Sequence, residues 1–155
     1  MTGSTTSGYW VRPAEAGDHA AWNSLYASYA DFYGVSQSPT DRATVWSWIL
    51  DPDHEVRALL LIDGTGRPAG LAHYRPFARP LAASTGGYLD DLFVHPSSRG
   101  AGGATMLLAE LRRISRDAGW TVLRWITADD NERARSVYDR SATRTSWVTY
   151  DMAPD

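Results

Sequence analysis

The sequence predicts a single-domain α/β or α+β fold built on a mixed sheet. Strand-like and helix-like segments alternate through the second half of the chain, which favours this class. The chain has 155 residues, of which 43% are apolar, enough for one core. No internal repeat or low-complexity linker divides it. We therefore expect residues 1–8, rich in Ser, Thr and Gly, to form a flexible tail and residues 9–155 to form one domain.

The first elements are a short strand and two helices. Residues 9–12 favour a strand that ends before a proline. Residues 15–33 carry aromatic and aliphatic side chains at helical spacing, and Gly34 follows where a C-cap is expected. A second helix is predicted to start after Pro39–Thr40 and to end at Asp51.

The periodicity then changes to that of strands. The apolar run 56–62 leads through the turn-forming residues 63–66 into a second predicted strand, 68–74. Residues 76–87 contain two prolines and a Gly–Gly pair and are predicted to form a loop. Residues 88–94 form the next predicted strand.

The last elements alternate between helix and strand. Residues 102–118 place leucine and isoleucine side chains on one face and arginines on the other, which predicts an amphipathic helix. A strand over 121–127, a short helix over 131–140 and a final strand over 146–152 complete the expected order.

Composition excludes several function classes. The net charge is −3, and all fifteen basic residues are arginine. This balance argues against a nucleic-acid-binding module, which needs cationic contacts to phosphates. The absence of cysteine excludes disulfides, thiolate metal sites and a cysteine nucleophile. No apolar run is long enough to span a membrane, and no signal-peptide pattern opens the chain, so we expect a cytoplasmic protein without membrane contacts.

A glycine-rich turn connects the strand 88–94 to the helix 102–118. Glycines allow close backbone approach to a ligand, and the N–H groups at a helix start attract anions. A pyrophosphate would fit such a turn, whereas the alternative is simply a tight strand–helix connection. The chain has no Gly-Lys-Ser/Thr P-loop, and its glycine spacing does not match the dinucleotide-binding fingerprint.

Two motifs resemble those of the GCN5-related N-acetyltransferase (GNAT) family. The run Arg99–Ala104 fits the acetyl-CoA signature Arg/Gln-x-x-Gly-x-Gly/Ala, and Asn131, Ala134 and Tyr138 fit a second signature about thirty residues on. The resemblance is strongest over residues 88–150. It implies a GNAT-like mixed, twisted central β-sheet flanked by helices. It also implies direct acetyl transfer from acetyl-CoA to a primary amine, with CoA as product and no metal.

The resemblance also assigns roles to individual residues. The backbone of Phe93 and Val94 would bond the pantetheine arm, and Asn131 would contact the cofactor. Tyr138 would donate a proton to the departing thiolate, although a tyrosine on an amphipathic helix can also serve packing alone. A phenol is protonated at pH 7 and can serve as a general acid. The pyrophosphate would be held by the N–H groups of Arg99, Gly100, Ala101, Gly102, Gly103 and Ala104.

Asp90 is the candidate catalytic base. The local run resembles the diamine acetyltransferase branch, in which a glutamate takes this position and acts as base. Aspartate is one methylene shorter, so its contact would run through water. The alternative, that Asp90 only attracts a cationic substrate, stays open. Side chains alternate along a strand, so we expect Asp90 and Asp91 to face opposite sides.

The first two helices are expected to shape the acceptor pocket with aromatic and acidic side chains. Tyr33 and Asp90 are the candidate substrate contacts. The expected acceptor is a small cationic amine (a polyamine, a diamine or an amino acid). The alternatives are a protein lysine, an antibiotic amine, or a non-catalytic acyl-CoA-binding regulatory domain. The four histidines lack metal-ligand spacing, so no metal site is expected.

The end of the chain departs from the common family pattern. No glycine follows Tyr138 within three or four residues, and the run resembles a subgroup that contains a yeast histone and polyamine acetyltransferase. This departure bears on the final strand and not on the cofactor turn. A homodimer is expected from the habit of the family.

Overall fold

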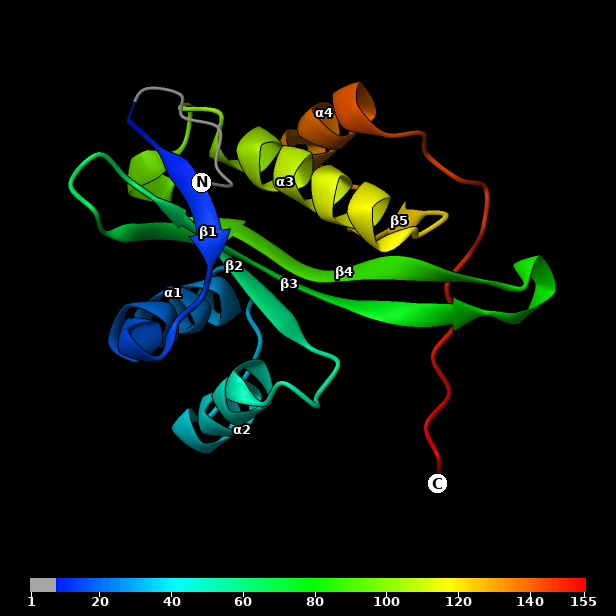
Figure 1. Ribbon diagram of the computed structural model, residues 1–155, viewed down its shortest axis with the longest axis horizontal. Helices are drawn as coiled ribbons and strands as arrows, with labels where there is room; N and C mark the ends of the chain where they lie inside the picture. The colour runs from blue at the N-terminus through cyan, green and yellow to red at the C-terminus, as the bar shows by residue number, and fades with distance from the viewer. Residues whose placement is uncertain (1–7) are drawn as a thin grey trace.

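A mixed, five-stranded sheet forms the centre of the molecule (Figure 1). The computed structural model describes residues 8–155, so most of the predicted tail 1–8 lies outside the described residues. The strands follow chain order, antiparallel from β1 to β4, and β5 joins β4 in parallel. Their bounds are β1 (Trp10–Pro13), β2 (Arg57–Ile62), β3 (Pro68–Arg79), β4 (Ser84–Val94) and β5 (Leu123–Arg124).

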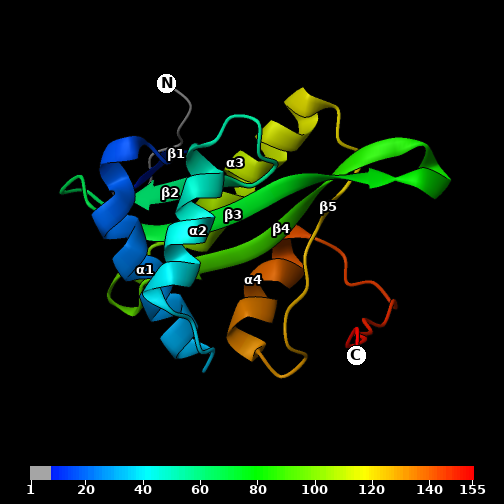
Figure 2. The same ribbon diagram turned by 90° about the horizontal axis from the view of Figure 1, so that it is seen from below.

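Four α-helices cover the two faces of this sheet, which confirms the predicted fold class (Figures 1 and 2). The helices α1 and α2 lie on one face and α3 and α4 on the other. Their bounds are α1 (His19–Phe32), α2 (Pro39–Leu50), α3 (Gly103–Ala118) and α4 (Glu132–Ser141). Among the described residues, no helix is long and apolar enough to cross a membrane.

The apolar run of β2 supplies both layers of the core. Leu59 and Leu61 pack in the cluster under α3, whereas Leu60 and Ile62 pack in the cluster under α1 and α2. Successive strand residues point to opposite faces, so a continuous apolar run suits a strand covered on both sides. The strand β2 therefore joins the two halves of the core.

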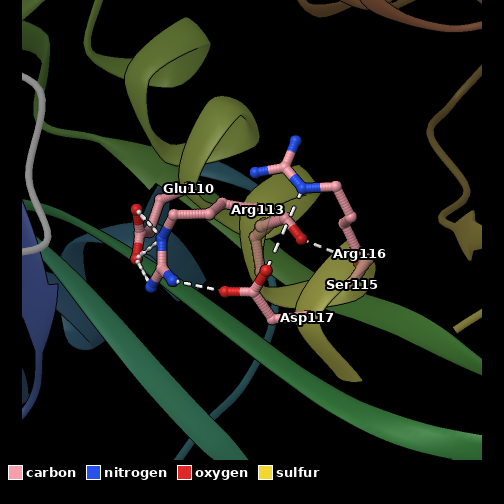
Figure 3. Close-up of polar contacts among 6 residues, drawn as sticks. Glu110, Arg113, Ser115, Arg116 and Asp117 are labelled. Atoms are coloured by element: carbon pink, nitrogen blue, oxygen red, sulfur yellow. Dashed lines mark hydrogen bonds and ion pairs between the residues drawn. The ribbon is translucent and has the colours of Figure 1, made fainter. Parts of the chain in front are cut away.

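The helix α3 shows the amphipathic character that the sequence predicts. Its buried face includes Leu107 and Leu111, which have no exposed surface. On its outer face, Arg113 donates hydrogen bonds to Glu110 and Asp117 (Figure 3). This face is held by surface ion pairs, which contribute little to stability.

The predicted loop over 76–87 is wrong, because most of it is a long β-hairpin. The strand β3 continues to Arg79 and β4 begins at Ser84, with a single 3₁₀ turn between them. Pro76 is tolerated because β2 ends opposite Tyr74, leaving β3 with a neighbour on one side only. Gly87 is required at its position, since a Cβ there would collide with the Trp120 ring.

The predicted final strand over 146–152 is also wrong. Residues 142–155 form no strand or helix, and the tail leads away from α4 (Figure 1). A strand needs a neighbour to satisfy its backbone, and residues 8–155 supply none for this segment. Four large apolar side chains are left exposed there: Trp147, Val148, Tyr150 and Met152. The predicted strand 121–127 is reduced to Leu123–Arg124.

Candidate active site

The strands β4 and β5 separate soon after they meet. Their pairing is confined to Gly87↔Leu123 and Tyr88↔Arg124, while β4 runs on to Val94. The stretch 89–94 therefore presents an edge without a neighbouring strand in the described chain. An extended amide chain can add to such an edge by backbone hydrogen bonds. The predicted pantetheine contacts, Phe93 and Val94, lie on this edge.

The glycine-rich turn lies at the end of the same strand. Gly100 and Gly102 have φ of +90° and +79°, a conformation that favours glycine, and a Cβ at either would meet only open space. The first N–H groups of α3 have no acceptor within the helix. Gly103 differs, because a Cβ there would collide with Leu61 of β2. The turn thus offers backbone donors to an anion and fits a pyrophosphate.

Arg99 connects this turn to α1. Its Nε donates to the Val94 carbonyl at 3.2 Å, and its guanidinium lies 4.6 Å from the centre of the Phe32 ring. A second ring, that of Phe93, lies 5.9 Å away. The Arg99 guanidinium therefore makes cation–π contacts with the Phe32 and Phe93 rings.

The structure brings three predicted residues together between α1 and α4. Asn131 caps α4 by accepting from the Ala134 N–H at 3.2 Å, and its Nδ2 donates to the Tyr33 hydroxyl at 3.4 Å. Tyr138 packs edge-on against Trp125. Burial, with a smaller contribution from Tyr33, raises the pKa of Tyr138 to about 12. Its phenol is therefore protonated at physiological pH.

Asp90 lies in a β-bulge, so the expected alternation with Asp91 is wrong. His73 pairs with Asp91 and Tyr74 pairs with Leu89, which leaves Asp90 as an extra residue on β4. Its carboxylate accepts two hydrogen bonds from Arg75, at 3.0 and 3.3 Å. Burial raises the pKa of Asp90, and the Arg75 contacts oppose that shift.

Asp91 belongs to a hydrogen-bonded cluster that the sequence did not reveal. The Trp22 indole donates to His73 Nε2 at 2.8 Å, and His73 Nδ1 lies 2.8 Å from Asp91 Oδ2. Tyr26 donates to the same oxygen at 2.9 Å. His73 is 2% exposed, whereas the Asp91 side chain keeps 19% exposure. The only available signal was the inward position of His73 on β3, which many core histidines share.

The environment of Asp91 favours its charged form. Burial alone would raise the pKa of Asp91, but its contacts with His73 and the hydrogen bond from Tyr26 outweigh it and lower the pKa. Burial and the nearby Asp91 charge raise the pKa values of Tyr26 and Tyr29. Both phenols therefore stay protonated, and that of Tyr26 donates to an anionic carboxylate.

Comparison with known proteins identifies the family. The family model described as acetyltransferase (GNAT) family matches residues 22–142. The chain belongs to this family. It is an acetyl-CoA-dependent N-acetyltransferase, and the unpaired edge of β4 and the turn at 99–104 are where its cofactor residues are expected. Residues 8–155 contain no cluster of three or more histidine and carboxylate side chains able to hold a metal.

Curated relatives and many solved structures resemble the chain. The D-amino-acid N-acetyltransferase HPA3 of Saccharomyces cerevisiae is 28% identical over 141 residues, covering 90% of this chain and 88% of the relative. A ribosomal-protein-alanine N-acetyltransferase from Brucella melitensis biovar Abortus 2308 shares the fold with a TM-score of 0.79 and 21% identity, covering 94% and 98% of the two chains. AAC(6')-Iy, solved with the bisubstrate analogue CoA-S-monomethyl-acetylneamine, has a TM-score of 0.81 at 18% identity, covering 95% and 99%.

Proposed function

We propose that this N-acetyltransferase acts on a small primary amine and that an amino acid suits its pocket best. The observation that carries the proposal is the different state of two adjacent carboxylates. Asp90 is already paired with Arg75, whereas Asp91 is surrounded by hydrogen-bond donors and keeps its charge available. The pair of carboxylates therefore offers one anion, that of Asp91, for an ammonium group.

The same contrast suggests the proton acceptor. Two carboxylates whose surroundings shift their pKa values in opposite directions are suited to different tasks. Asp90, with a raised pKa, is the better base for removing a proton from the ammonium. Asp91, with a lowered pKa, is the better permanent anion for binding it.

The remaining roles belong to the cofactor side. Acetyl-CoA supplies an activated thioester, to which the neutral amine adds directly, since the chain has no cysteine to carry an acyl group. The turn at 99–104 and the backbone of Phe93 and Val94 would hold the cofactor, with Asn131 beside its arm. Tyr138 would pass its proton to the departing sulfur, and its raised pKa means that it acts mainly as a hydrogen-bond donor until charge develops there.

An amino acid fits this charge pattern better than a diamine. A diamine or polyamine carries several positive charges, and one of the two adjacent carboxylates is already neutralised. An amino acid brings one ammonium for Asp91 and one carboxylate that would share the Arg75 guanidinium with Asp90. Both partners lie on the α1 face, because Arg75 follows His73 by two residues on β3. The amino-acid activity in the name of the yeast relative agrees with this choice.

The first experiment is acetyl-CoA-dependent thiol release against a panel of amines. We expect release with amino acids and little with polyamines. The variant Arg75→Met should raise the amino-acid KM at least tenfold and change diamine turnover far less. Release with polyamines alone, or with peptides or aminoglycosides alone, would overturn the amino-acid choice. CoA binding without release for any amine would favour a regulatory, non-catalytic domain.

We also propose that the protein is a cytoplasmic homodimer, and the C-terminal tail supports the dimer. Trp147 and Tyr150 are 84% and 89% exposed, and the apolar pattern of residues 146–152 is that of a strand lacking its neighbour. A second copy can supply the sheet edge or groove that this chain does not. Sedimentation should show a dimer that becomes monomeric when residues 143–155 are removed. A monomeric full-length chain would overturn the proposal.

A further inference from the structure

The buried pair Trp22–His73 lies behind Asp91 and has no part in the chemistry described so far. We propose that Trp22 and His73 are positioning residues that hold Asp91 as an oriented anion for the ammonium group of the acceptor. The inference rests on the proposed function, because it assigns Asp91 to that amine. Its elements come from α1, β3 and β4, far apart in sequence.

The hydrogen bonds determine the state of His73. An indole Nε1–H can only donate, so His73 Nε2 must be the acceptor in its 2.8 Å contact with Trp22. The proton of a neutral imidazole then lies on Nδ1, which donates to Asp91 Oδ2 at 2.8 Å. Protonating Nε2 would place two N–H groups against each other in a site without exposed surface at Trp22. Trp22 thus selects one neutral tautomer.

A neutral donor has a specific consequence for Asp91. A protonated histidine would neutralise the carboxylate, as Arg75 does for Asp90, and would weaken attraction for a cation. A neutral Nδ1–H orients the carboxylate and leaves its charge uncompensated. The other titratable or charged groups facing this cluster are His19, Tyr26 and Tyr29 on α1, Arg75 on β3 and Asp90 on β4.

Two contacts show that this arrangement is more than core packing. Tyr26 donates to the same oxygen at 2.9 Å, so two neutral donors fix one edge of the carboxylate. The Asp91 side chain nevertheless keeps 19% exposure, while His73 behind it keeps 2%. The carboxylate is therefore held from the buried side and open on the other, as a binding group requires.

A matched pair of variants at His73 separates positioning from packing. In His73→Asn the amide nitrogen can replace Nδ1 and still donate to Asp91. In His73→Gln the amide oxygen can replace Nε2 and still accept from Trp22, but the donor to Asp91 is lost. We expect the Gln variant to raise the amine KM about tenfold or more, while the Asn variant stays within about threefold. Calorimetric affinity for CoA should be unchanged in both.

The variant Trp22→Phe tests the tautomer. Without the indole N–H, no donor faces His73 Nε2, and this nitrogen is free to take a proton. The ratio of variant to wild-type kcat/KM for the amine should therefore fall as the pH is lowered. A packing defect alone would lower that ratio equally at every pH. Taking the ratio cancels the titration of the amine and of Asp90.

A measurement without turnover distinguishes the two proposals. Imidazole ¹⁵N NMR of the wild type should show His73 protonated only at Nδ1 from pH 5 to 8. A doubly protonated ring in that range, or equal KM values for the two His73 variants, would overturn the positioning role. If both His73 variants fail to fold, the NMR result and the Trp22→Phe profile decide it. Failure of the wild type to acetylate any small amine would overturn the proposed function but leave the tautomer result standing.

Discussion

The proposed cofactor side and the proposed acceptor side of the site are built in different ways. The cofactor side uses backbone groups from one continuous stretch, the end of β4 and the turn at 99–104. The acceptor side uses side chains from α1, β3 and β4, and the Trp22–His73 contact spans 51 positions of sequence. The cofactor side depends on the local backbone conformation, whereas the acceptor side depends on the tertiary packing of distant segments.

This difference indicates which amino-acid substitutions each side tolerates. A backbone site depends on φ angles and on the absence of side chains, so most substitutions outside its glycines leave it intact. A site made of buried hydrogen bonds fails when one partner is lost, because the other stays unpaired. The following predictions test this contrast, beginning with the largest effect.

Gly102→Glu should abolish CoA binding. The side chain would enter the open space before the turn, add negative charge beside the pyrophosphate position and strain a residue with φ of +79°. We expect at least a hundredfold loss of CoA affinity by calorimetry. Gly66→Glu is the matched control, since Gly66 has φ of +86° and open space but lies in the β2–β3 turn. Equal CoA affinity in both variants would refute the pyrophosphate assignment.

Tyr138→Phe should lower kcat about a hundredfold without changing CoA affinity, because only the proton donor is removed. With a pKa of about 12, the phenol stays protonated, so wild-type kcat should show no loss attributable to Tyr138 up to about pH 10. Tyr150→Phe, in the exposed tail, is the control. Undiminished turnover in the Tyr138 variant would remove it as the acid.

Gly103→Ala should lower the free energy of unfolding by about 1–3 kcal/mol, because its Cβ collides with the buried Leu61. Chemical denaturation measures the change. A Cβ at the neighbouring Gly102 would contact no other atom, so Gly102→Ala carries only the cost of placing alanine at a positive φ. A larger loss of unfolding free energy in Gly102→Ala than in Gly103→Ala would contradict the assignment of Gly103, and not Gly102, to core packing.

The Arg12–Asp18 ion pair should give the smallest effect. Hydrogen bonding from Arg12 lowers the pKa of Asp18. A carboxylate with a lowered folded-state pKa adds stability above its unfolded pKa of about 3.9, and that stability is lost as pH falls through the folded value. Asp18→Asn should therefore cost up to about 1 kcal/mol near neutral pH and much less at pH 3. A pH-independent difference in denaturation would show that the pair is not responsible.

Prediction from the sequence succeeded where the signal was local. The helices over α1 to α4 and the glycine turn follow from periodicity and from caps such as Gly119, whose φ is +73°. The prediction failed at the long β3–β4 hairpin, because Pro76 was interpreted as a loop signal. Pro76 fits there because β3 has lost one neighbour, a fact that only the sheet contains.

The acceptor side was less accessible to prediction. Asn131 and Tyr138 were selected through a family motif and Tyr33 from the aromatic residues of the first helix. The structure places Asn131 within hydrogen-bond distance of Tyr33. The β-bulge at Asp90 was not predicted, because it is a shift in the pairing register of β3 and β4. The sequence of neither strand shows that shift by itself. His73 was considered only as a metal ligand, among four histidines that lack metal-ligand spacing.

By itself, the sequence determined the fold class, the family and the glycine-rich turn, because each depends on residues within one short stretch or at a fixed spacing. The tertiary structure alone decided which carboxylate is paired and which is free, and that Trp22 selects the tautomer of His73. It also decided that residues 146–152 have no strand to join within one chain. Hydrogen bonds between distant elements set charge and orientation, and these depend on packing geometry that no local pattern contains.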